Sequence, residues 1–130
     1  MPRPADRPLA RPLQPMELMV LSVLTDAAHH GYGLVRAIEE RTEGALAVRP
    51  GNLYRVLDRL VEAGLVAEGE PPVGSDPDAG SSRGAERTRH FSITERGRGR
   101  VAAEAETLGR ALGASPRLRR ALRRGLGSAT

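Results

Sequence analysis

Residues 49–66 place a strongly two-sided helix directly before a strand, and this segment constrains the fold more than any other. At 100° per residue, the aliphatic side chains fall within one arc of the helix and the polar ones within the opposite arc. The aliphatic arc holds Leu53, Val56, Leu57, Leu60 and Val61, and the polar arc holds Asn52, Arg55, Asp58, Arg59 and Glu62. Such a helix must lay its aliphatic face on a core and present the other face to solvent.

The polar face carries side chains suited to reading DNA. Its basic and amide groups, Asn52, Arg55 and Arg59, lie toward the start of the helix, the end that a recognition helix presents to base edges in the major groove. An arginine can pair with guanine, and an asparagine with adenine, through two hydrogen bonds. Taken alone, the pattern also fits a helix whose polar face is simply solvated.

Three motifs, in order along the chain, resemble those of the PadR family of bacterial transcriptional regulators. Residues 51–55 and 60–66 resemble the family's Gly-Thr-Leu-Tyr-Pro opening of the recognition helix and its Gly-Leu-Val ending. Residues 30–34 resemble the Gly-Tyr turn at the start of the second helix, and residues 89–94 with Gly97 resemble the second wing strand and the start of the last helix. The resemblance covers residues 15–112 and implies a winged helix-turn-helix that binds double-stranded DNA as a homodimer.

The chain departs from the family pattern where DNA would be read. Asn52 and Arg55 replace the usual Thr and Pro, Phe91 replaces a Tyr, and the wing is long.

The resemblance implies repression by steric exclusion of polymerase as the commoner outcome. Some relatives bind flat aromatic inducers between their subunits, but a chain with no Trp, one Phe and two Tyr is poorly equipped for that mode. Any small-molecule effector is therefore unspecified.

Composition suits one small domain. A length of 130 residues leaves room for a single core, and the absence of cysteine excludes a disulfide framework and a cysteine-ligated zinc. The N-terminus has no apolar segment after its charges, and the apolar residues 16–24 are too few to cross a bilayer. We therefore expect a cytoplasmic protein with no membrane partner.

The net charge of +4, in which every cation is an arginine, is distributed unevenly. Residues 117–124 hold five Arg and no acid, and residues 1–15 hold three Arg against one Asp, so these tails carry +5 and +2 and leave −3 for the rest. DNA binding must then come from local patches, because affinity depends on the phosphates neutralised. The expected DNA-binding residues are Arg49, Asn52, Tyr54, Arg55, Arg59, Arg83, Arg87 and Arg89.

Two groups among these have alternative interpretations. The wing arginines, 83, 87 and 89, are expected to contact phosphates or the minor groove, although they could instead only solubilise a loop. Tyr54 lies at the edge of the polar arc. Its hydroxyl could reach the DNA backbone, or its ring could be half-buried in the core.

The chain divides into four expected parts. Residues 1–14 form a flexible arm rich in Pro and Arg, residues 15–94 the winged helix-turn-helix, residues 95–114 a dimerisation helix, and residues 115–130 an Arg-rich amphipathic tail. The fold class is mainly α with a small β-hairpin wing. Its strands are expected at residues 65–70 and 88–93, joined by a long loop of turn-forming residues.

The helix boundaries can also be predicted. Pro15 opens a first helix that is apolar nearly all round, so part of it could be buried against a second subunit. A second helix runs to about Arg41 and is stopped by Gly44. Pro50 suits the first turn of the third helix, unless that helix starts later with Asn52 as its cap.

The last helix carries an apolar stripe that must be covered. Thr94 can cap it, and its apolar residues recur at spacings of four, three and four. We expect the stripe to pack on a symmetry mate, although packing on the chain's own first helix is the alternative. The expected interface residues are Met16, Val20, Val101, Ala105, Leu108 and Leu112. Ser115-Pro116 is a second cap-like signal, and the tail that follows it could contact DNA backbone, anionic lipid or an acidic partner, or remain unattached.

No constellation for catalysis is found. The histidines are His29, His30 and His90, two adjacent in an expected turn and one on a wing strand, with no metal-site spacing. The glycine pairs at 31 and 33 and at 97 and 99 lack the third glycine of a dinucleotide fingerprint, and no phosphate loop is present. The sequence therefore predicts no enzyme, no cofactor and no metal.

The function expected from sequence is that of a homodimeric regulator. Its two recognition helices would enter successive major grooves of a pseudo-palindromic operator, about 34 Å apart. One alternative is a winged-helix interaction module without DNA binding, which holds a protein partner through its Leu-rich faces and basic tail. Another is an RNA-binding or membrane-surface protein led by the Arg-rich tail.

Overall fold

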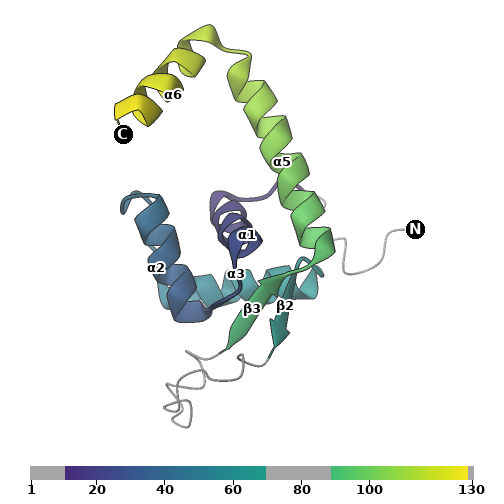
Figure 1. Cartoon of the computed structure of the whole chain (residues 1–130). Helices are drawn as coiled ribbons and strands as arrows, with labels where there is room; N and C mark the ends of the chain where they lie inside the picture. Colours follow the sequence, from purple (N-terminus) through teal and green to yellow (C-terminus); the bar gives the residue numbers. More distant parts are fainter. Residues whose placement is uncertain (1–10, 70–88, 129–130) are drawn as a thin grey trace, which may run out of the picture.

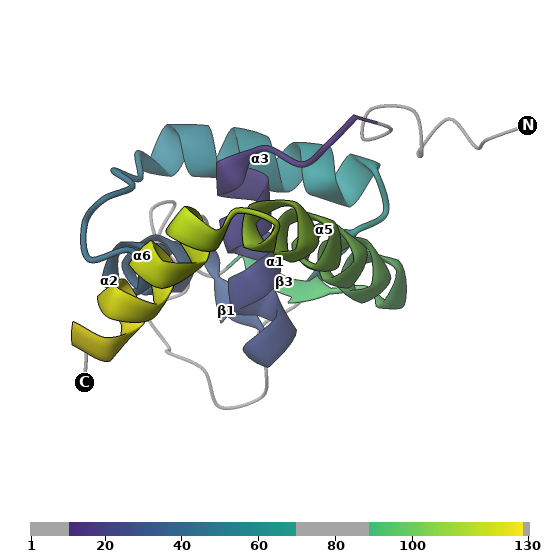
Figure 2. The ribbon, with the colours of Figure 1, turned by 90° about the horizontal axis from the view of Figure 1, so that it is seen from above.

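The computed structural model describes residues 11–69 and 89–128, with side chains described up to residue 125. The elements are α1 (Pro15–Asp26), β1 (His29–His30), α2 (Gly31–Arg41), α3 (Pro50–Glu62), β2 (Val66–Gly69), β3 (His90–Ile93), α5 (Glu95–Gly113) and α6 (Pro116–Ser128). Figures 1 and 2 show α5 running from the sheet past α1, and α6 turning back from the far end of α5 on the side away from α3. The mainly helical fold with a small sheet is the one predicted.

The sheet is antiparallel and has three strands in the order β1-β3-β2. β2 and β3 pair along their whole length, as the predicted hairpin requires. The other edge of β3 pairs with β1, where His29 lies opposite Phe91 and His30 opposite His90. The predicted two-stranded wing is therefore incomplete, because the two histidines expected in a turn form a strand. Two residues are too few to give a periodic signal in sequence.

The ends of α2 have local causes. The Nδ1 atom of His30 accepts a hydrogen bond from the amide of Gly33 at 3.0 Å, which caps the start of the helix. At the other end, Gly44 has a φ of +79° and its amide donates to the carbonyl of Glu39 at 2.9 Å. Glycine adopts this left-handed conformation at little cost, so the predicted stop at Gly44 is confirmed.

Helix α3 begins at Pro50, with Arg49 at the cap position and no side-chain cap. The alternative of a later start capped by Asn52 is therefore wrong. Four of the five residues of the aliphatic arc are buried, since Leu53, Val56, Leu57 and Leu60 are each at most 2% exposed, and Val61 is half-buried. The arc meets α1 and α2 in the core, whose other fully buried members are Val20, Leu21, Val23, Leu24, Leu34, Ile38 and Phe91. Each such aliphatic side chain contributes about 1.5–3 kcal/mol by leaving water.

Residues 11–14 pack against the body and do not belong to a flexible arm. Leu13 is only 6% exposed and joins the core. Its amide donates to the carboxylate of Glu104 on α5, and Arg100, also on α5, donates to the carbonyl of Arg11 at 2.6 Å. The expected boundary at residue 14 is therefore too late, whereas residues 1–10 lie outside the described part of the chain.

The last two helices start at predicted caps. Thr94 Oγ1 accepts from the amide of Gly97 at 3.0 Å at the start of α5. Ser115 Oγ accepts from the amide of Leu118 at 3.2 Å at the start of α6. Helix α6 leaves Leu118 and Leu122 37% and 48% exposed. The amphipathic basic tail is therefore helical.

Candidate nucleic-acid interface

The polar face of α3 forms an exposed surface along one side of the molecule. Asn52, Arg55, Asp58 and Arg59 are exposed, and the aliphatic residues between them are buried. Figure 2 shows α3 along an outer edge, with α6 on the other side of the body. A straight duplex could therefore approach α3 without meeting the C-terminal helix.

Arg55 and Asn52 are exposed polar side chains near the start of α3. Both lie in its first two turns, and within the described residues neither makes an ion pair or a side-chain hydrogen bond. Arg49, just before the helix, is exposed and equally unengaged there. A guanidinium group that holds no internal partner needs to break no contact before it binds a base edge or a phosphate.

Arg59 differs from these residues in two respects. It lies in the last turn of α3 and not toward its start, where it was predicted to lie from the sequence, and an acid lies beside it. Its side chain is 44% exposed, and Nη2 lies 3.8 Å from Oε2 of Glu17, a carboxylate on α1 that is fully buried. The contact is longer than a hydrogen bond, so it is a loose ion pair. Arg59 therefore lies on the polar face of α3 and makes one weak ion pair inside the protein.

Arg89 ties the wing to α3. It donates to Glu68 on β2 at 2.7 and 2.9 Å and to Asp58 on α3 at 3.0 Å. Its guanidinium also lies over the rings of Tyr54 and Phe91, 5.3 and 5.2 Å from their centroids. The hydrogen bond between Arg89 and Glu68 lowers the pKa of Glu68 and raises the pKa of Arg89. A phosphate would have to compete with two carboxylates for this guanidinium.

Tyr54 is half-buried, which agrees with the core interpretation of its ring. The ring lies 6.4 Å from that of Phe91, tilted by 53°. On its other side it fits against Gly31 at the start of α2, where an added Cβ would come within 2.6 Å of Tyr54 Cζ. Tyr54 therefore joins α2, α3 and β3. Arg83 and Arg87, the other wing residues expected to contact DNA, lie outside the described residues.

The buried acid Glu17 was not among the residues predicted from the sequence. Two hydrogen bonds of 2.9 Å from Arg11 and one of 2.7 Å from the amide of Gln14 hold its carboxylate. Burial by itself raises the pKa of Glu17, but these hydrogen bonds outweigh burial, and the pKa lies below its ordinary value. The available signal was a glutamate three residues after the cap position of α1, the spacing of a capping box.

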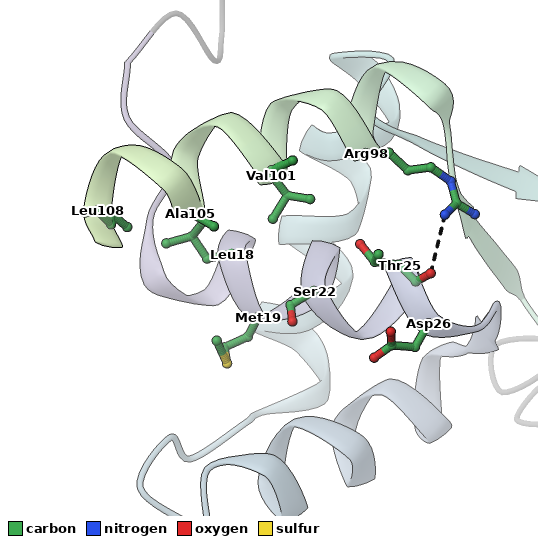
Figure 3. Close-up of a pocket in the computed structure, with 10 residues that line it drawn as sticks. Leu18, Met19, Ser22, Thr25, Asp26, Arg98, Val101, Ala105 and Leu108 are labelled. Atoms are coloured by element: carbon green, nitrogen blue, oxygen red, sulfur yellow. Dashed lines mark hydrogen bonds between the residues drawn. The ribbon is translucent and has the colours of Figure 1, made fainter. Parts of the chain in front are cut away.

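A groove of about 420 Å³ lies between α1 and α5. Figure 3 shows Leu18 of α1 next to Ala105 of α5, and Met19, Val101 and Leu108 also line the groove. At one end Arg98 donates to the carbonyl of Thr25 at 3.5 Å. The groove is mainly apolar and open to solvent.

The residues expected at a dimer interface fall into three groups. Leu108 and Leu112 are 41% and 46% exposed, Ala105 is exposed, and Met16 is half-buried. Val101 is 9% exposed, because it packs on the chain's own core. Val20 is fully buried inside the subunit and has no surface to offer a partner, so it does not belong in this set.

Two features are absent from the described part of the chain. No group of three or more His, Cys, Asp or Glu side chains there could hold a metal ion. No helix in the same residues combines the length and apolar character needed to cross a membrane.

The chain forms a winged helix-turn-helix, which consists of helix α2, the turn after it, the exposed and partly basic helix α3, and a small antiparallel sheet. This is the architecture of a class of DNA-binding proteins. Residues 20–103 match the family model of the PadR-like transcriptional regulators. This protein belongs to the PadR-like family, whose members are transcriptional regulators that bind DNA and are not enzymes.

Individual relatives agree with this assignment. The chain is 33% identical over 112 residues, 82% of its length, to the transcriptional regulator YqjI of Escherichia coli K12. It spans about half (51%) of the length of that relative. Among solved structures, RosR of H. salinarum superimposes with a TM-score of 0.61 at 26% identity, covering 92% of this chain and 96% of that one.

A PadR family transcription regulator from Clostridium difficile has the same fold. Its TM-score is 0.55 at 17% identity, with 76% of this chain and 95% of the other covered.

Proposed function

We propose that this protein is a sequence-specific DNA-binding repressor that acts as a homodimer on a pseudo-palindromic operator. The observation that carries the proposal is the pair of exposed side chains Asn52 and Arg55 in the first turns of α3, which make no ion pair or side-chain hydrogen bond with any other described residue. Because the buried aliphatic arc holds the helix rigidly from behind, these side chains reach the solvent from a fixed platform. Such platforms read base edges in the major groove.

The remaining contacts would position the duplex. Arg49 and Arg59 lie at the two ends of the exposed face of α3 and are suited to phosphates. The expected wing contacts of Arg83 and Arg87 stay part of the proposal. Arg89 would contribute chiefly by holding β3 against α3, since two carboxylates already occupy its guanidinium.

Replacing Arg55 with alanine tests the base-reading role. DNA fragments bound by the parent protein are first selected from random sequence, and affinities are then measured for the selected site and for unrelated DNA. We expect Arg55→Ala to weaken binding to the selected site by about tenfold to a hundredfold, the loss of one bidentate base contact, with little change for unrelated DNA. Discrimination between the two would fall accordingly.

The matched control is Arg123→Ala, which removes the same charge from the exposed face of α6, away from α3. Its affinity for the selected site should stay within about twofold of the parent. Equal losses in the two variants would mean that only the total charge matters. If the parent protein selected no DNA, the alternative of a winged-helix interaction module would replace the proposal. Sites that overlap promoters would support repression.

Homodimerisation is supported by apolar surface that the subunit leaves uncovered. The groove between α1 and α5 opens beside Leu108, and Leu112 follows one turn later on α5. Isolated exposed leucines are ordinary, but a stripe of them along one helix beside an apolar groove marks an interaction surface. A second copy of α5 would supply a matching stripe in a symmetric interface.

The double change Leu108→Asp and Leu112→Asp should make the protein monomeric. Two carboxylates cannot be buried in the interface without partners, so the molar mass measured by light scattering should fall to half. Thr107→Asp is the control, because it puts a charge on an exposed position of α5 outside the stripe. A dimer that survives the double change would contradict this interface.

A further inference from the structure

Glu17 is the only buried charged side chain within the described part of the chain. It lies in the first turn of α1, and its two carboxylate oxygens receive the two hydrogen bonds from Arg11 and the one from the amide of Gln14. A buried carboxylate is costly unless a cation and hydrogen bonds compensate it. Arg11 therefore stabilises the fold by compensating the buried charge of Glu17 at the edge of the protein core.

The same carboxylate faces a second cation. Arg59 reaches it from α3 and approaches Oε2 to 3.8 Å, whereas the Arg11 contacts are 2.9 Å. One guanidinium from the segment before α1 thus holds Glu17 tightly, and one from the recognition helix holds it loosely. Arg59 can swing to a phosphate without leaving Glu17 unpaired only while Arg11 remains in place.

Removing Arg11 would change which guanidinium group pairs with Glu17. Glu17 would keep its buried charge, and Arg59 would be its nearest remaining cation. The attraction between a buried carboxylate and a nearby guanidinium is stronger than that of an exposed pair, because less water screens it. Arg59 would then be drawn inward, away from the exposed face of α3.

We infer that Arg11 is a positioning residue for DNA binding, which satisfies Glu17 and so keeps Arg59 free to contact DNA. The inference rests on the proposed function. The backbone around Arg11 is itself fixed on α5, through the bond from Arg100 to the Arg11 carbonyl and the bond from the Leu13 amide to Glu104. The segment before α1 therefore links α5 to the recognition helix.

The test is a cycle of variants in the full chain, with affinity for the selected DNA site measured over a range of salt concentrations. Arg59→Ala should weaken binding about tenfold and reduce the slope of log affinity against log salt by about one, the signature of one lost phosphate contact. Arg11→Ala should give a similar loss and a similar change of slope. The double variant should bind no more weakly than Arg59→Ala alone, because both changes remove the same contact.

The decisive variant combines Arg11→Ala with Glu17→Gln. The neutral amide no longer attracts Arg59, so affinity and salt slope should return to within about twofold of the parent. A residue that only stabilises the fold would not produce this recovery of slope. If Arg11→Ala does not fold, Arg11→Gln takes its place, since its amide can still donate one hydrogen bond to Glu17 while lacking the charge.

The other possible outcomes contradict the inference, and they show whether the proposed function fails with it. Additive losses at positions 11 and 59 would show that Arg11 contacts DNA itself, and would overturn the inference. So would an Arg11→Ala variant, or its Gln replacement, that binds like the parent. If Arg59→Ala has no effect while Arg55→Ala does, the inference fails and the proposed function stands. If the parent binds no DNA, both fail.

Discussion

Replacing Gly97 with alanine is expected to lower the free energy of unfolding by about 3 kcal/mol. Gly97 lies in the first turn of α5 and packs directly on the chain between α3 and β2. A Cβ at this position would come within 3.0 Å of the carbonyl carbon of Leu65, closer still to its oxygen, and within 2.8 Å of Ile93 Cγ1. The methyl group therefore has no room.

The backbone at Leu65 cannot easily move aside. Its carbonyl accepts from the amide of Thr94 at 3.1 Å, and its amide donates to the carbonyl of Leu60 at 2.9 Å. Helix α5 would have to shift instead, and the cap at Thr94 would be disturbed with it. For a domain whose total stability is roughly 5–15 kcal/mol, a loss of this size is severe.

Gly99→Ala is the matched control, since nothing lies within 4 Å of its added Cβ. In a helix interior this change should stabilise the protein by up to about 1 kcal/mol. Both variants are compared with the parent by denaturant unfolding at one protein concentration. A Gly97→Ala variant as stable as the parent would show that α5 does not approach the Leu65 carbonyl this closely.

Replacing Phe91 with alanine should cost about 3–5 kcal/mol, because it empties the space of a large, fully buried ring. The ring contacts the recognition helix, where it lies beside Tyr54, and the guanidinium of Arg89 lies over it. Phe91 also lies at the centre of the sheet, paired with His29 on one side and Glu68 on the other. Its loss should therefore loosen the wing as well as the core.

Two control variants distinguish the effect of losing the volume of the Phe91 side chain from the effect of changing any residue of β3. Phe91→Leu keeps most of the volume and should cost less than about 2 kcal/mol. Ser92→Ala changes the next residue of β3, whose side chain is exposed, and should change stability by no more than about 0.5 kcal/mol. The thermal unfolding midpoint, followed by circular dichroism, ranks the three variants. A Phe91→Ala midpoint equal to that of Ser92→Ala would contradict the packing described above.

Local signals in the sequence predicted the helical frame well. The stop of α2 at Gly44, the cap of α5 at Thr94 and the start of α6 after Ser115 each depend on one residue and its near neighbours. The buried arc of α3 follows from a period of 3.6 residues, which needs no knowledge of the partner surface. The family motifs added the order of the elements and the DNA partner.

Features that depend on distant residues were not predictable in this way. Strand β1 exists because β3 lies beside it, and its two residues carry no periodic signal of their own. Val20 and Leu108 are both aliphatic positions on helices expected at the dimer surface, yet one is fully buried and the other 41% exposed. Periodicity identifies an apolar face, but not which part of that face the chain itself covers.

Three arginines show the same difference between what the local sequence predicts and what depends on distant residues. Arg55, Arg59 and Arg89 were all candidate DNA-binding residues in the sequence, since all are cationic and lie on expected DNA-facing elements. Among the described residues, Arg55 has no ion-pair or hydrogen-bond partner for its side chain, Arg59 has a loose partner in Glu17, and Arg89 is held by Glu68 and Asp58. The difference decides which of them can meet a phosphate or a base without first breaking an internal ion pair.

The sequence by itself determined the family, the helical frame and the face of α3 that turns to solvent, because these depend on residue type and on spacing along one element. Only the tertiary structure decided which cations are available and how residues 11–14 join α5 to the recognition helix. The reason is that an ion pair or a buried carboxylate depends on distances between side chains far apart in the chain, and local spacing carries no record of them.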